Sequence, residues 1–337
     1  MDFSLADEQV ELQSAFGRLF DHHSPISLVR AAEPLGFSED LWRRLGELGV
    51  PEMAADSEDQ PAASLSQLLV IAEELGRTLA PVPFIETATA ARAIARGGST
   101  WPAATMPGAP SPIVTFSPRP LTTKVPLLSA GAIADGVVGI ADNQLVFADL
   151  ADNAPKRATK NLGSSPLATR TIGATRAVLA DPGADAFDRA LDDWKVLTAG
   201  ALYGLARRGH EIALAYVKER KAFGVPIGWF QTVAHRLADS ANDLDGARFL
   251  THQAAWAIDD GRPDAPALTS MAYAFTTALA ERVTAESLHF HGGIGYTREH
   301  DIQLYFRRAK AWPLLLGDPR SEYATVADRL FGPRKEK

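Results

Sequence analysis

Cysteine is absent from this 337-residue sequence. Without thiols the chain can form no disulfide, use no thiolate nucleophile and offer no cysteine ligand to a metal ion. An excess of basic residues is also missing, because the formal net charge is −7. This balance argues against non-specific nucleic-acid binding, which requires a basic face. The chemistry available to the chain therefore comes from oxygen and nitrogen groups and from the backbone.

Long apolar runs are missing as well. No run reaches the ~18 residues that a membrane-spanning helix needs, so no membrane span is expected. The opening stretch MDFSLADEQVELQ is acidic and polar, without the basic and apolar regions of a signal peptide, and we expect a cytoplasmic protein. Hydrophobic residues make up 46% and charged residues 22%, as in ordinary globular proteins.

Apolar residues at helical spacing dominate the first ~110 residues. Leu12, Phe16 and Phe20 indicate one helix. Ser38 is a candidate N-cap for a second helix, with Leu41, Trp42, Leu45 and Leu48 on its apolar face and Gly49 after its end. Further helices are predicted over about 64–79 and 84–96.

The pattern changes after residue 100. A proline-rich stretch over 100–120 is interpreted as a linker, and 121–188 carries short β-type runs: VVGIA, QLVFADL and TRTIGATRAVLA. Asp142-Asn143 marks a turn between the first two runs. Helical spacing then returns in long segments over about 188–221, 229–260 and 265–289, followed by a final pair.

These patterns predict an α+β fold that is mainly α. We expect an N-terminal helical domain over 1–112, a short middle β domain over 113–188 and a C-terminal helical bundle over 189–337. Short connections between the long helices favour an antiparallel four-helix bundle.

The segment ERKAFGVPIGWFQ (219–231) separates two of the long helices. Arg220 can simply complement a helix dipole at its C-terminus, with Gly224 as a stop signal. The functional alternative is an anion grip, in which Arg220 binds a phosphate, Phe223 packs on a flat ring and Gln231 supplies an amide.

A glycine turn, FHGGIGYTREHD (290–301), follows the last long helix. Its glycines either turn a corner or bring the backbone close to a ligand as a phosphate-binding nest. The spacing is neither a dinucleotide-binding GxGxxG after a strand nor a P-loop. His289 and His291 flank the glycines without nearby carboxylate ligands, so we predict no metal site.

Taken together, ERKAFGVPIGWFQTVAHRLAD and HGGIGYTREHDIQLYFRRAKAW resemble the C-terminal half of the flavin-dependent acyl-CoA dehydrogenases. LWRRLGELGV and EELGRTLAPVPF resemble the first helical domain of that family. The resemblance implies a helical, β and four-helix-bundle architecture. It also implies tetramers that bind FAD between subunits.

The resemblance places a set of residues against the FAD of a neighbouring subunit: Arg220, Phe223, Gln231, His289, Gly292, Gly293 and Gly295. His289 stands where the family usually has Gln, and an imidazole offers its donor and acceptor in a different geometry.

The family's catalytic base is missing. Dehydrogenation removes an α-proton with a carboxylate while hydride leaves the β-carbon for the flavin, so a Glu must reach the α-carbon. Most members place it where this chain has Leu316, and a minority where it has Trp194. Asp193 and Asp318 are near misses. No catalytic residue is therefore predicted.

The family's flavin- and substrate-contacting segment in the β domain is also not visible, and the proline-rich stretch takes its place. The leading hypothesis is a non-catalytic subunit of a heterotetrameric acyl-CoA dehydrogenase. It resembles subunits of actinobacterial steroid side-chain enzymes, with a homologous catalytic subunit supplying the Glu. Acyl-CoA would bind through the complex, and an electron-transfer flavoprotein would accept the electrons.

Two alternatives remain at this stage. One is a self-sufficient homotetrameric dehydrogenase, or a flavin oxidase or monooxygenase of the same fold, with Asp193 or Asp318 as an off-position base. The other is a flavin-free helical scaffold.

Overall fold

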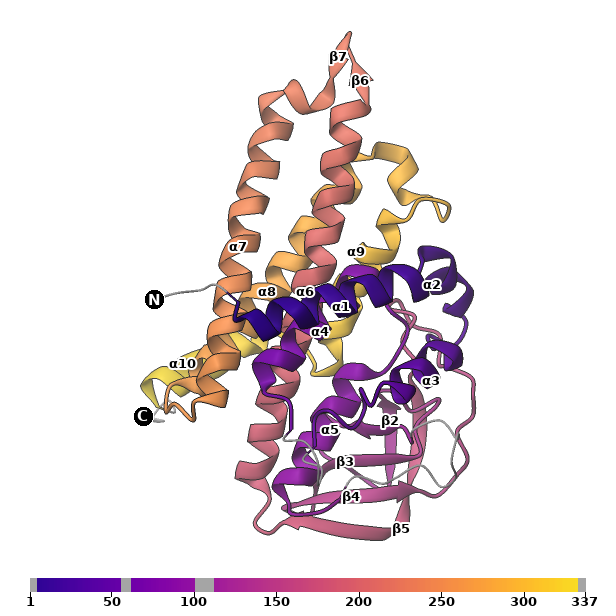
Figure 1. Ribbon diagram of the computed structural model, residues 1–337, viewed down its shortest axis with the longest axis vertical. Helices are drawn as coiled ribbons and strands as arrows, with labels where there is room; N and C mark the ends of the chain where they lie inside the picture. The colour runs from indigo at the N-terminus through magenta and orange to yellow at the C-terminus, as the bar shows by residue number, and fades with distance from the viewer. Residues whose placement is uncertain (1–4, 56–61, 101–111, 333–337) are drawn as a thin grey trace. The chain divides into compact units, whose positions relative to one another are not determined.

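A computed structural model describes residues 5–55, 62–100 and 112–332 of the chain (Figure 1). The main helices are α1 (Asp7–His23), α2 (Ile26–Ala32), α3 (Glu39–Glu47), α4 (Leu65–Thr78), α5 (Phe84–Arg96), α6 (Ala184–Glu219), α7 (Gln231–Asp259), α8 (Ala265–Phe290), α9 (Ile302–Ala311) and α10 (Glu322–Phe331). The strands are β1 (Val114–Phe116), β2 (Lys124–Leu128), β3 (Gly136–Ala141), β4 (Gln144–Leu150), β5 (Ala168–Ala180), β6 (Lys221–Ala222) and β7 (Val225–Pro226).

The chain forms two compact units. Unit 1 takes its described residues from 1–21, 69–80 and 198–337, and unit 2 from 22–68 and 81–197. The boundaries between the units fall within the helices α1, α4 and α6. The division into domains at 1–112, 113–188 and 189–337 stays a prediction.

Local sequence signals set several element boundaries. The Oγ atom of Ser38 accepts a hydrogen bond from the Leu41 amide at 3.3 Å and so caps α3, as the sequence predicts. Leu41, Trp42 and Leu45 are buried, whereas Leu48 is 61% exposed, so its assignment to the apolar face was wrong. Leu48 lies beyond the last turn of α3, where the helical period no longer directs its side chain.

Unit 2 contains a five-stranded sheet in the order β1-β3-β4-β5-β2. All neighbouring strands are antiparallel except β1 and β3. The predicted turn at Asp142-Asn143 joins β3 to β4, and both residues have positive φ, as a tight two-residue hairpin requires. The interpretation of 100–120 as a linker was wrong over Val114–Phe116, because this apolar triplet pairs with β3. Residues 101–111 lie outside the described ranges.

The core of the sheet is apolar and is partly covered by α5, which packs on β1, β3 and β5 (Figure 1). The buried residues of this core are Leu121, Val125, Leu128, Val137, Ala141, Val146, Ala148 and Ile172. Strands β1 and β3 are buried along almost their whole length, so this part of the sheet lies inside unit 2.

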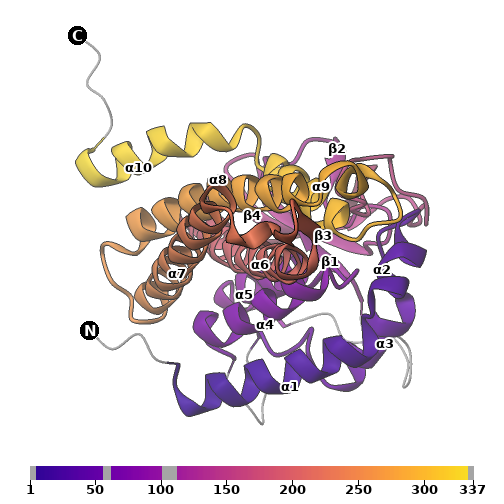
Figure 2. The same cartoon turned by 90° about the horizontal axis from the view of Figure 1, so that it is seen from above.

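Long helices build unit 1. In both views α7 runs alongside α8, and α9 and α10 also pack on α8 (Figures 1 and 2). The crossing of α4 with α6 depends on two glycines. A Cβ at Gly76 would lie 1.9 Å from the Ala201 carbonyl oxygen, and one at Gly204 would lie 1.9 Å from the Glu73 carbonyl oxygen. Only glycine allows the two backbones to approach this closely.

Candidate functional site

The predicted anion grip lies on a β-hairpin between α6 and α7. Lys221 pairs with Pro226 and Ala222 with Val225, which leaves Phe223-Gly224 as a two-residue turn. Phe223 has φ 54° and Gly224 has φ 86°. Turns of this kind favour Asn-Gly, and a left-handed non-glycine residue costs on the order of 1–2 kcal/mol.

Phe223 occupies this strained position while its side chain is 96% exposed. Its ring makes an edge contact with Phe230, with 6.3 Å between ring centroids. Trp229 nearby is 73% exposed. The hairpin therefore presents aromatic surface that this chain leaves largely uncovered.

Arg220 begins the hairpin and is exposed. Its backbone is fixed at both ends, because its amide donates to the Tyr216 carbonyl and its carbonyl accepts from the Ile227 amide, each at 2.8 Å. Within the described residues its guanidinium forms no ion pair. Gln231, the first residue of α7, is also exposed.

The glycine turn follows α8 as a 3₁₀ helix, η2 (Gly292–Tyr296). Its three glycines differ in whether backbone conformation or close packing requires them. Gly292 has φ 61°, and a Cβ at Gly295 would lie 2.6 Å from the Leu288 carbonyl oxygen. Gly293 has neither constraint, and a Cβ there would meet no described atom within 4 Å. Internal packing explains Gly295, whereas Gly293 leaves open space beside exposed backbone.

The buried side chain of His291 holds the start of this turn in place. His289 is exposed, whereas His291 is buried and its Nδ1 donates to the Ser287 carbonyl at 2.7 Å. The ring of His291 stacks between Tyr216 and His300, with centroids 4.3 Å and 4.4 Å away. Burial, and then His300, lower the pKa of His291. No local sequence pattern indicates this stack, because His291 and His300 are nine positions apart and meet only through the turn.

The hairpin and the glycine turn lie at the same end of unit 1. Val217 and Ile227 flank the hairpin and share one apolar cluster with Phe290, the last residue of α8. The contact between Tyr216 and His291 joins the same two segments. The structure thus brings the two sequence motifs together.

Neither usual base position carries a carboxylate. Leu316 is partly exposed at the end of a 3₁₀ turn. The neighbouring Asp318 accepts hydrogen bonds from the backbone and guanidinium of Arg320, and these bonds lower the pKa of its carboxyl. A carboxylate held ionised in this way is a poor proton acceptor near neutral pH.

The second position belongs to unit 2. Trp194 is buried in α6, and the adjacent Asp193 is fully buried. Two arginines of α5 hold Asp193: Arg92 Nε lies 2.9 Å and Arg96 Nη1 lies 2.7 Å from its Oδ2. This clamp was not foreseen, because a spacing of about a hundred residues gives no local signal. It gives Asp193 a structural role.

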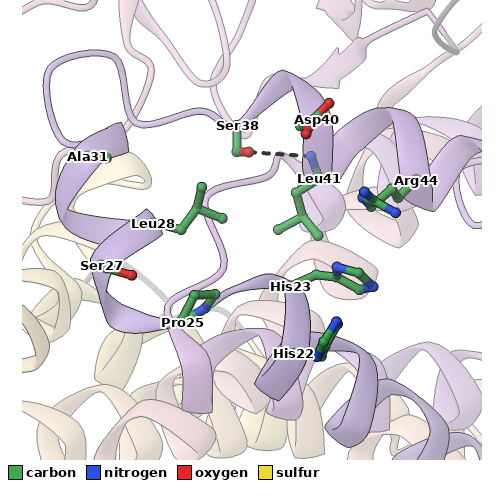
Figure 3. A pocket seen from close by; sticks show the side chains of 10 residues that line it. All are labelled: His22, His23, Pro25, Ser27, Leu28, Ala31, Ser38, Asp40, Leu41 and Arg44. Atoms are coloured by element: carbon green, nitrogen blue, oxygen red, sulfur yellow. Dashed lines mark hydrogen bonds between the residues drawn. The ribbon is translucent and has the colours of Figure 1, made fainter.

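A pocket of about 450 Å³ lies between the end of α1, α2 and α3 (Figure 3). His22, His23 and Arg44 form its nitrogen-rich side, and Leu28 and Leu41 its apolar side. Burial, Arg44 and His22 together lower the pKa of His23. None of the predicted site residues lines this pocket.

Within the described ranges no group of three or more His, Asp or Glu residues is arranged to hold a metal ion. No helix in the same ranges is both long and apolar enough to cross a bilayer.

Comparison with known proteins gives consistent matches. A family model described as acyl-CoA dehydrogenase, C-terminal domain, matches residues 181–331. The acyl-CoA dehydrogenase IpdE2 of Mycolicibacterium smegmatis is 33% identical over 97% of this chain and 100% of its own length.

Two solved structures are similar along nearly the whole chain. A steroid acyl-CoA dehydrogenase, the Tcur3481-Tcur3483 G363A variant, matches with a TM-score of 0.83 and 25% identity, over 97% of this chain and 98% of that one. The ChsE4-ChsE5 complex of Mycobacterium tuberculosis matches with a TM-score of 0.84 and 22% identity, over 98% and 99%.

Proposed function

The chain belongs to the acyl-CoA dehydrogenase family, and from this premise we propose that it is the non-catalytic subunit of a heteromeric acyl-CoA dehydrogenase. The observation that carries the proposal is the lack of a usable base. Leu316 and Trp194 hold the two positions where the family places its Glu, and neither side chain accepts a proton.

The nearby carboxylates do not replace that base. Asp193 is inaccessible and paired with two guanidinium groups, so its oxygens are already occupied. Asp318 is engaged by Arg320, and its lowered pKa makes it a weaker base. A catalytic Glu would therefore come from a homologous partner subunit.

The family is FAD-dependent, and FAD accepts the hydride when it is bound. The exposed groups of this chain fit a cofactor held by a neighbouring subunit. Arg220 offers to a phosphate a guanidinium that forms no ion pair with the residues the structure describes, Phe223 offers an exposed ring, and Gln231 an amide. Gly292 and Gly293 leave room for a ligand beside the backbone, and Gly295 fixes the turn. His289 lies at the exposed edge of the same segment.

Several finer features belong to the same proposal. The substrate is an acyl-CoA, and the name of one similar solved structure, a steroid acyl-CoA dehydrogenase, favours a steroid-derived acyl group. The other is named as a complex of two different proteins, which favours a heteromer, and we propose a heterotetramer. Electrons leave the complex through an electron-transfer flavoprotein, and the complex works in the cytoplasm.

The test is the visible spectrum of the purified chain alone and after co-expression with a candidate partner, with FAD counted per chain. A suitable partner is a longer family member whose gene is adjacent and which retains the Glu. We expect no flavin in the chain alone and about one FAD per pair of chains in the complex. A full complement of flavin and dehydrogenase activity in the chain alone would contradict the proposal and favour a self-sufficient enzyme.

A further inference from the structure

A second candidate site lies in unit 2, on the long loop between β4 and β5. This loop and the turn between α2 and α3 together line a cavity of about 870 Å³. The two segments meet directly, since the Oγ atom of Ser164 donates to Glu33 Oε1 at 3.1 Å. A Cβ at Gly36 would lie 2.1 Å from the Ser164 carbonyl oxygen, so the contact requires glycine.

The lining of this cavity is strongly cationic for a chain of net charge −7. Lys156, Arg157 and Lys160 contribute three positive charges, and Glu33 is the one carboxylate among its lining residues. The three basic side chains form no ion pair with any residue in the described ranges. Because unpaired like charges repel, such a cluster is stabilised by an anion placed among them.

The loop that carries these charges is held by its own hydrogen bonds. Asn161 Nδ2 donates to the carbonyls of Thr159 and Ser165, each at 2.8 Å, and Asn161 Oδ1 accepts from the Ser165 amide. The Lys156 amide donates to Ala132 and the Thr159 amide to Leu167. These hydrogen bonds hold the loop backbone through contacts within the chain, which lowers the entropy cost of binding a ligand there.

The size and chemistry of the cavity select a class of ligand. Its volume lies within the ~300–1,000 Å³ that small-molecule sites typically have. Pro34, Leu35 and Ala158 add apolar surface next to the cations. The geometry points to a nucleoside diphosphate, whose two phosphates pair with the basic side chains and whose base contacts the apolar wall.

The test is calorimetric titration of the full chain with ADP, in excess FAD so that ADP does not simply occupy a flavin site. Pyrophosphate and adenosine serve as partial ligands. We expect ADP to bind with an affinity that falls as salt is raised, pyrophosphate to bind more weakly, and adenosine to give no measurable heat. Equal binding of adenosine and ADP, or no binding of ADP, would overturn the proposal.

A matched pair of variants locates the site. Arg157→Gln/Lys160→Gln removes two cations from the cavity, whereas Arg119→Gln/Lys124→Gln removes the same two residue types from exposed positions of unit 2 outside it. We expect the first pair to weaken ADP binding at least about tenfold and the second to change it less than about twofold. Equal losses in both would show a response to net charge alone and would rule out the site. Glu33→Gln, which removes the opposing charge, should tighten binding.

Discussion

Phe223 combines two unfavourable features in one residue. It holds a left-handed backbone that suits glycine or asparagine, and it exposes a large aromatic ring to solvent. Neither feature stabilises the isolated chain. Strained and exposed residues of this kind are expected where a second molecule covers them. At the residue scale, these two features support the proposal that the hairpin contacts a partner subunit.

Arg220 gives the first prediction at this scale. In the complex with the catalytic partner, Arg220→Ala should lower FAD retention at least about tenfold, because a charge-assisted contact contributes ~1.5–3 kcal/mol. The measurement is the FAD content after gel filtration at matched protein concentration. The control is Lys218→Ala, two residues earlier and also exposed. Unchanged FAD retention in Arg220→Ala would remove Arg220 from the site.

Asp193 gives a prediction about stability, in contrast to the prediction about FAD binding at Arg220. Asp193→Asn should lower the free energy of unfolding by about 3 kcal/mol, because it leaves Arg92 and Arg96 facing a neutral amide. The estimate is at the lower end of the usual range, since the Arg96 side chain is 35% exposed. Urea denaturation measures it, with exposed Asp188→Asn in the same helix as the control. Turnover per folded complex should not change. A specific loss of turnover without loss of stability would instead make Asp193 a catalytic base.

At the scale of elements, periodicity and turn chemistry predicted most of the fold. The helices α3 to α8 and the strands β3 to β5 occur close to their predicted ranges. The short elements α2, β1 and β2 were missed. Seven residues of α2 are too few for a helical period, and β1 has three residues beside a proline-rich segment. Their structure depends on pairing partners distant in sequence, which no local pattern reveals.

The candidate site, like the fold, was predictable from the sequence only in part. The sequence could place Arg220, Phe223 and the glycines on short connections between long helices, and the structure adds that these connections meet through Val217, Ile227 and Phe290. The clamp on Asp193 and the stack around His291 were not predictable, because each joins elements that meet only in three dimensions. Whether the predicted residues contact a flavin stays a prediction.

The glycine turn supplies the prediction at this scale. Gly295→Ala should lower the free energy of unfolding by about 1–3 kcal/mol, since its Cβ would collide with the Leu288 carbonyl. Gly293→Ala should change stability by less than about 0.5 kcal/mol, because the Cβ enters open space. In the complex, however, Gly293→Ala should reduce FAD retention. Thermal unfolding of the chain alone measures the loss of stability, and the FAD content of the complex measures the loss of cofactor binding. Equal losses of stability in Gly293→Ala and Gly295→Ala would contradict the different roles assigned to the two glycines.

At the scale of the whole molecule, buried histidines make the free energy of unfolding depend on pH. Burial is the main cause that lowers the pKa values of His23, His210 and His291. A histidine with a lowered pKa in the folded state binds protons more weakly than it does in the unfolded chain. As pH falls below about 6.5, the unfolded state gains protons first, and the free energy of unfolding decreases. The lowered pKa values of Asp152, Asp264 and Asp318 act in the same direction, but only nearer pH 4, so they add to the loss below this interval.

We therefore expect the chain to be less stable at pH 5.5 than at pH 7.5, by an amount that urea denaturation at the two values measures. His291→Leu should reduce this difference, because it removes one of the three responding groups and fills the buried position with a side chain that does not titrate. Since His291 and His300 together support the glycine turn, the complex should also lose FAD over the same pH interval, and less so in His291→Leu. Stability that is equal at both pH values would mean that these histidines ionise in the folded chain without cost, and the stack would then have no part in the pH response.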